Sequence, residues 1–70
     1  MATGTVRWFK DTPQKGSYGF IKPDDNSRDV FFEFNSIAVK QANLPSKGRK
    51  VEYTLNPTTK GLVAKDLKVL

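Results

Sequence analysis

The chain has 70 residues, and its 12 lysine and arginine residues outnumber seven aspartate and glutamate residues to give a net charge of +5. It contains no cysteine and no histidine, which excludes disulfide bonds, zinc sites built from these residues, and Ser-His-Asp or Cys-His catalytic groups. We therefore expect one small domain over residues 1–70 that is not an enzyme, uses no cofactor or metal, and favours a polyanionic partner over a small-molecule substrate.

Nothing in the sequence indicates export or insertion into a membrane. Residues 1–4 lack the charged start and apolar core of a signal peptide. The longest apolar stretch, residues 30–32, is far too short to span a bilayer. We expect a cytoplasmic protein without a membrane partner, and a monomer unless an exposed edge strand pairs with a second copy.

The first half of the chain predicts three strands separated by turn-forming residues. Residues 5–10 are rich in β-branched and aromatic side chains, and residues 17–21 and 29–34 alternate between two faces. Pro13 and Gly16 place a loop between the first two strands, and residues 23–27 form a turn of proline, aspartate, asparagine and serine.

The second half predicts two further strands after a long connection. Residues 36–40 favour one helical turn, which Pro45 and Gly48 keep from growing longer. Strands follow at residues 50–56 and 62–70, with a turn expected over residues 56–61. Five short strands leave many unpaired edges unless the sheet closes, so the predicted fold is all-β: a small five-stranded antiparallel OB-fold barrel.

Aromatic residues are concentrated where function is expected, since seven of the eight lie between positions 8 and 34. The strand pattern favours a core that contains Ile21, Val30, Phe32 and Tyr53. If those side chains are buried, alternation turns Tyr18, Phe20 and Phe31 toward solvent. An exposed aromatic patch suggests a binding site, and unpaired nucleic-acid bases stack on such rings while nearby lysine and arginine contact phosphates. This surface should prefer single strands, because a duplex hides the faces of its bases.

Two aromatic residues do not fit this simple alternation. It places Trp8 with Val6, and Phe34 with Phe32, on the face expected to be buried. A bend in the first strand would turn Trp8 outward. Nearby, the carboxylates of residues 24, 25 and 29 favour a solvated turn over a metal site or acid–base chemistry.

Three segments resemble motifs of the bacterial cold-shock proteins. Gly-Thr-Val-Arg-Trp-Phe at residues 4–9 is similar to their opening strand. Residues 15–21, Lys-Gly-Ser-Tyr-Gly-Phe-Ile, resemble their first ribonucleoprotein motif, Lys-Gly-Phe-Gly-Phe-Ile. Residues 29–34, Asp-Val-Phe-Phe-Glu-Phe, resemble the second, Asp-Val-Phe-Val-His-Phe, and Asn-Ser-Ile at 35–37 resembles Ser-Ala-Ile.

The resemblance implies an OB-type barrel that binds single-stranded RNA and DNA, with a preference for pyrimidines. Family members act as RNA chaperones and regulators of transcription or translation, and many are induced by cold. The resemblance implies that Arg7 and Lys15 contact the nucleic-acid backbone and that Asp29 makes a polar contact at the rim. It implies that the stacking platforms are Trp8, Tyr18, Phe20, Phe31 and Phe34. With Lys10 and Glu33 added for their position, the expected nucleic-acid-binding residues are Arg7, Trp8, Lys10, Lys15, Tyr18, Phe20, Asp29, Phe31, Glu33 and Phe34.

The sequence also departs from the family motifs. The loop before Lys15 is longer than usual, and one additional residue, Ser17, separates Lys15 from Tyr18. Glu33 replaces the family's histidine, and residues 38–47 lack the aromatic side chain often found there. We expect these changes to lower affinity. Glu33 either repels phosphate and favours cytosine, or is neutralised by a basic side chain such as that of Arg7.

Two other functions remain open from the sequence. A small barrel with an aromatic groove suits a module that binds a proline-rich peptide, although the positive charge gives such a peptide little reason to bind. A ribosome-associated OB domain would instead need contacts with structured RNA. The sequence leaves open the choice between RNA and DNA, the base preference and any response to cold.

Overall fold

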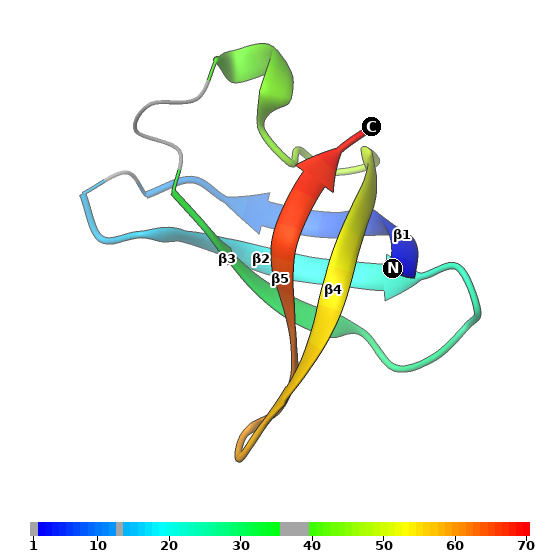
Figure 1. Ribbon diagram of the computed structural model, residues 1–70. Coiled ribbons are helices and arrows are strands. Elements are labelled where there is room, and N and C mark those ends of the chain that lie inside the picture. The colour runs from blue at the N-terminus through cyan, green and yellow to red at the C-terminus, as the bar shows by residue number, and fades with distance from the viewer. Residues whose placement is uncertain (1, 13, 36–39) are drawn as a thin grey trace.

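The computed structural model describes residues 2–12, 14–35 and 40–70. Its elements, in chain order, are β1 (Ala2–Lys10), β2 (Ser17–Pro23), β3 (Val30–Phe34), the 3₁₀ helix η1 (Gln41–Asn43), β4 (Lys50–Thr58) and β5 (Gly61–Val69). The strands close into a barrel in the order β1-β2-β3-β5-β4 (Figure 1). The predicted all-β, five-stranded barrel is confirmed.

One pair of strands departs from the antiparallel arrangement expected for the whole sheet. β1–β2, β2–β3, β1–β4 and β4–β5 are antiparallel, whereas β3 and β5 run parallel, with Phe31 opposite Val63 and Phe32 opposite Ala64. The reason is parity: an odd number of strands in a closed ring cannot alternate in direction at every junction. The parallel junction is formed by β5, which follows η1 and β4 in the chain and then pairs with β3.

The turn expected over residues 56–61 is shorter than predicted. β4 continues through Pro57 to Thr58, and Pro57 lies opposite Leu62. Proline is tolerated here because β1 covers β4 only over residues 50–53, so this end of β4 is a free edge. The β4–β5 hairpin therefore projects beyond the body of the barrel, at the bottom of Figure 1.

The predicted helical turn at residues 36–40 falls almost entirely outside the described residues. The 3₁₀ helix lies just after it, at Gln41–Asn43. Within the described ranges, no helix has both the length and the apolar character needed to cross a bilayer.

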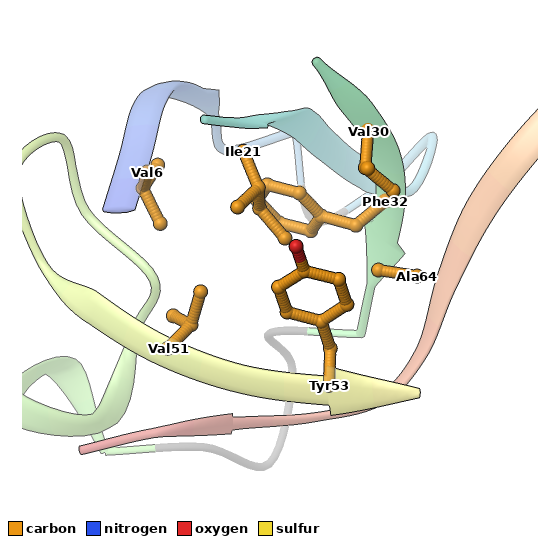
Figure 2. Close-up of a cluster of buried hydrophobic side chains, with 7 residues drawn as sticks. All are labelled: Val6, Ile21, Val30, Phe32, Val51, Tyr53 and Ala64. Atoms are coloured by element: carbon orange, nitrogen blue, oxygen red, sulfur yellow. The ribbon is translucent and has the colours of Figure 1, made fainter. Parts of the chain in front are cut away.

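The barrel interior is filled by side chains from all five strands. Seven of them are buried and converge in Figure 2: Val6, Ile21, Val30, Phe32, Val51, Tyr53 and Ala64. The predicted core positions of Ile21, Val30, Phe32 and Tyr53 are confirmed. Leu55 lies on the same face of β4 as Val51 and Tyr53. It is nevertheless 44% exposed, because β1 does not cover this part of β4.

The Tyr53 side chain brings a polar group into this apolar interior. Its ring rises from β4, and its hydroxyl points into the cluster near Ile21 (Figure 2). The hydroxyl is buried with no hydrogen-bond partner among the described residues. Burial, which disfavours the phenolate, raises the pKa of Tyr53 above its ordinary value.

Candidate functional site

An irregularity in β1 turns Trp8 out of the barrel. Val6 lies opposite Ile21 on β2, but the next paired residue is Trp8, opposite Phe20, so Arg7 is an additional residue in the ladder. Such a β-bulge shifts the alternation by one position. Val6 therefore points inward, Trp8 is 42% exposed, and Phe9 turns back toward the core. This is the bend that the sequence required but did not locate.

Gly19 allows β1 and β2 to approach each other at the bulge. A Cβ atom built on Gly19 would meet the Trp8 carbonyl oxygen, and would lie 2.9 Å from the Phe32 ring. Real Cβ atoms do not make contacts that short, so a larger residue would displace either the backbone of Trp8 or the core ring. Because Gly19 has no side chain, the Trp8 backbone and the Phe32 ring can both keep these positions.

Four aromatic side chains form a continuous surface, here called the aromatic face: Trp8, Tyr18, Phe20 and Phe31. Trp8 contacts Tyr18 and Phe20 at ring-centroid distances of 5.8 and 5.4 Å. Phe31 contacts the same two rings at 6.2 and 5.5 Å, which closes a circuit of four rings. The side chains of Tyr18, Phe20 and Phe31 are half-buried, so each presents part of its ring to solvent.

Strand register explains why these rings meet. Trp8, Phe20 and Phe31 lie opposite one another across β1, β2 and β3. A second row on the same outward face runs from Lys10 through Tyr18 to Glu33. The exposed ammonium group of Lys10 and the exposed carboxylate of Glu33 therefore border the aromatic face at its two sides.

Phe34 lies on the other face of β3, apart from the aromatic face. It is half-buried, packs against the core and meets Phe9 edge-on at 6.2 Å. Phe9 in turn stacks on Phe32 at 5.9 Å. The structure thus places Phe34 where strict alternation put it, at the edge of an inner cluster formed by Phe9, Phe32 and Phe34.

The Arg7 side chain is held by Asp29. Its Nε lies 2.8 Å from Oδ1 and 2.7 Å from Oδ2 of Asp29, and both side chains are substantially exposed. The bulge that exposes Trp8 also brings Arg7 to this partner. Arg7 is therefore paired with Asp29, and it does not neutralise Glu33.

Hydrogen bonds within the loop brace the β1–β2 connection despite its added length. The buried hydroxyl of Ser17 donates to the Asp11 carboxylate at 2.8 Å and accepts from the Thr12 backbone N–H at 3.2 Å. The Thr12 hydroxyl donates to the Gly16 carbonyl, and the Lys15 backbone N–H donates to the Thr12 carbonyl at 2.9 Å. The additional residue is thus an anchor of the loop, and it leaves the Lys15 side chain exposed.

A groove beside the aromatic face adds residues that sequence reasoning did not assign. It has a volume of about 920 Å³ and runs between Phe20 and Phe31 on one side and residues 58–62 of the β4–β5 hairpin on the other. Arg28 and Lys60 line it, together with Asp29 and Glu33. Their position beside these rings follows from the tertiary structure, because Arg28 precedes β3 whereas Lys60 lies in the turn between β4 and β5.

Two further carboxylates, those of Asp24 and Asp25, lie in the turn that follows β2, and both accept hydrogen bonds. Asp24 accepts hydrogen bonds from Lys50 Nζ at 2.6 Å and from the Thr3 hydroxyl at 2.7 Å. The bond from Lys50, followed by that from Thr3, lowers the pKa of Asp24. Asp25 is hydrogen-bonded by Ser27, which lowers its pKa as well. These two carboxylates stabilise the turn, and neither of them lines the groove that contains Glu33.

A closed five-stranded barrel with contiguous outward aromatic rings and nearby cations defines a small nucleic-acid-binding protein. Comparison with known sequences agrees. The 'cold-shock' DNA-binding domain matches residues 2–70. The chain is 43% identical to a cold shock-like protein of Aquifex aeolicus over 67 residues, covering 96% of this chain and 91% of that protein.

Two further relatives extend over nearly the same length. The major cold shock protein of Micrococcus luteus is 41% identical over 70 residues, which is the whole of both chains. The cold shock-like protein CspG of Escherichia coli is 37% identical over 68 residues, or 97% of this chain and 93% of that protein. The chain belongs to the cold-shock domain family, whose members bind nucleic acids and are not enzymes.

Proposed function

We propose that this protein binds single-stranded RNA and DNA by stacking unpaired bases on the aromatic face. The observation that carries the proposal is the closed circuit of four outward rings, with centroid separations of 5.4 to 6.2 Å. Apolar rings in contact with solvent are unfavourable unless a ligand covers them, and each stacked base contributes about 1–3 kcal/mol.

The cations around the aromatic face suit a phosphate backbone. Lys10, Lys15, Arg28 and Lys60 are exposed and are distributed over β1, the β1–β2 loop, the turn before β3 and the β4–β5 hairpin. Arg7 extends the series, although its ion pair with Asp29 must be loosened or shared before it contacts a phosphate. Asp29 and Phe34 remain proposed contacts at the margins of the site.

We propose that the protein uses this binding as an RNA chaperone. It would act as a monomer in the cytoplasm. By covering unpaired bases, it opposes the pairing of transcripts with themselves. Because duplexes bury their base faces, the protein acts on single strands as they become exposed, and this also gives it a means of regulating transcription or translation.

Fluorescence titration tests the stacking mode directly, because Trp8 is the chain's single tryptophan and is itself part of the aromatic face. A thymidine heptamer, a short DNA duplex and a polyproline peptide serve as ligands. We expect saturable quenching by the heptamer and at least about tenfold weaker binding of the duplex, corresponding to the loss of one or more stacked bases. Tighter binding of the peptide or the duplex would reject the proposal.

Salt dependence tests the phosphate contacts separately. For single strands, the logarithm of the association constant falls with the logarithm of salt concentration, with a slope of about −0.7 per phosphate neutralised. With a few cations at the face, we expect a slope of about −1 to −3. Affinity that does not change with salt would remove phosphate contacts from the mechanism.

A further inference from the structure

Two carboxylates line the groove beside the aromatic face, and they differ in what they contact. Both oxygens of Asp29 lie within 2.8 Å of Arg7 Nε, so that carboxylate is occupied. The Glu33 side chain is exposed, and its carboxylate makes no ion pair or hydrogen bond with any residue in the described part of the chain. Its acceptor oxygens therefore remain available to a ligand.

Glu33 lies where a stacked base would present its edge. Its Cα atom is opposite that of Tyr18 on β2, and it follows Phe31 by two residues on the same face of β3. It lines the groove containing Phe20 and Phe31, and also a second groove of about 460 Å³ bounded by residues 63–67 of β5. A base stacked on Tyr18 or Phe31 would therefore have this side chain beside it.

Chemistry decides which bases suit that position. An ionised carboxylate only accepts hydrogen bonds. Cytosine carries an amino group at the position where thymine and uracil carry a carbonyl oxygen, and glutamate accepts from that amino group. Thymine and uracil offer one ring N–H, but it lies between two carbonyl oxygens that repel a carboxylate. Guanine presents two adjacent N–H donors on its pairing edge, which match the two carboxylate oxygens.

We propose that Glu33 is a specificity-determining residue that selects cytosine and guanine over thymine and uracil on the aromatic face. This proposal rests on the proposed single-strand binding. The basis is the juxtaposition of an unpaired carboxylate with Tyr18 and Phe31, and the carboxylate acts in two separable ways. It repels the phosphate backbone whatever the sequence, and it accepts hydrogen bonds only from bases that carry a suitable donor.

The surrounding charges do not cancel this effect. Lys65 and Asp66 of β5 share the second groove with Glu33, while Arg28 and Lys60 share the first. Neither lysine forms an ion pair with Glu33, and the ion pairs among the described residues are Arg7–Asp29 and Lys50–Asp24. Cations in both grooves hold the phosphates, and Glu33 is left facing the bases between them.

A comparison of two charge-neutralising variants separates the two effects. Glu33→Gln keeps the size of the side chain but adds an N–H donor, so it accepts from cytosine and donates to thymine. Glu52→Gln is the matched control, because Glu52 lies on β4 opposite Thr3 and Lys68 and lines neither groove. Wild type and both variants are titrated with cytidine and thymidine DNA heptamers at low and high salt, following Trp8 fluorescence.

We expect wild type to bind the cytidine heptamer several-fold more tightly than the thymidine heptamer, and Glu33→Gln to reduce that ratio toward one. Glu33→Gln should also raise affinity for thymidine several-fold, an increase that shrinks at high salt. Glu52→Gln should leave the ratio unchanged. An equal ratio in wild type and Glu33→Gln would overturn the assignment of Glu33, whereas failure of both heptamers to bind would overturn the proposed function itself.

Discussion

The two faces of the β1–β3 sheet carry the same kind of residue with opposite consequences. Outside, Trp8, Tyr18, Phe20 and Phe31 touch one another and water; inside, Phe9, Phe32 and Phe34 touch one another and the core. Residue type alone therefore does not separate a binding ring from a structural ring. Position in the pleat separates them, and the bulge at Arg7 sets that position for Trp8.

The sharpest test of this comparison uses adjacent phenylalanines on opposite faces. Phe32 is fully buried, so Phe32→Ala should reduce the free energy of unfolding by about 3–5 kcal/mol. In a domain of this size, that loss is most of the total stability. Urea unfolding followed by circular dichroism measures it. Phe31→Ala is the matched control, and equal destabilisation by the two substitutions would mean that the faces are not distinct.

The converse prediction concerns binding. Phe20→Ala and Phe31→Ala should each weaken binding of a single-stranded heptamer by about 1–3 kcal/mol, the contribution of one stacked base. Each loses two ring contacts, and one such contact contributes about 0.5–1.5 kcal/mol, so the free energy of unfolding should fall by less than for Phe32→Ala. Isothermal titration and urea unfolding of the same samples separate the two quantities. A variant that unfolds yet retains affinity when folded would reverse the assignment of faces.

A smaller effect is expected from the polar atom in the core. Tyr53→Phe removes a buried hydroxyl that has no partner among the described residues, and should raise the free energy of unfolding by about 1 kcal/mol. Because burial raises the pKa of Tyr53, the unfolded chain ionises more readily than the folded one. Wild type should therefore lose stability as pH rises above about 10, and the variant should lose less of it. If Tyr53→Phe is destabilising, the hydroxyl has a partner after all.

Alternation in the sequence correctly predicted much of the barrel, because side chains on a paired strand must point to opposite faces. It placed Ile21, Val30, Phe32 and Tyr53 in the core, and all four are buried. It also turned three of the four rings of the aromatic face outward. The grouping of these rings follows from strand register, since Phe20 lies directly opposite Phe31.

What escaped prediction depends on contacts that are distant in sequence. Locating the bulge requires the pairing of β1 with β2, because an additional residue leaves no signature in the composition of β1. The Arg7–Asp29 ion pair spans 22 positions, and the hairpin side of the groove comes from residues 58–62. The parallel junction, in contrast, follows from the count of strands once closure is assumed.

We expect the β3–β5 junction to be the side of the barrel that opens locally at the lowest free energy. β3 and β5 are paired at two positions, Phe31 with Val63 and Phe32 with Ala64, whereas β1 and β2 are paired at six. Segments with few hydrogen bonds open at lower free energy than the whole molecule unfolds. A ligand lying between Phe31 and the hairpin bridges this junction, so binding should slow amide hydrogen exchange there by linkage to the closed state. If the proposed binding surface is correct, a bound strand would thus also stabilise the pairing of β3 with β5.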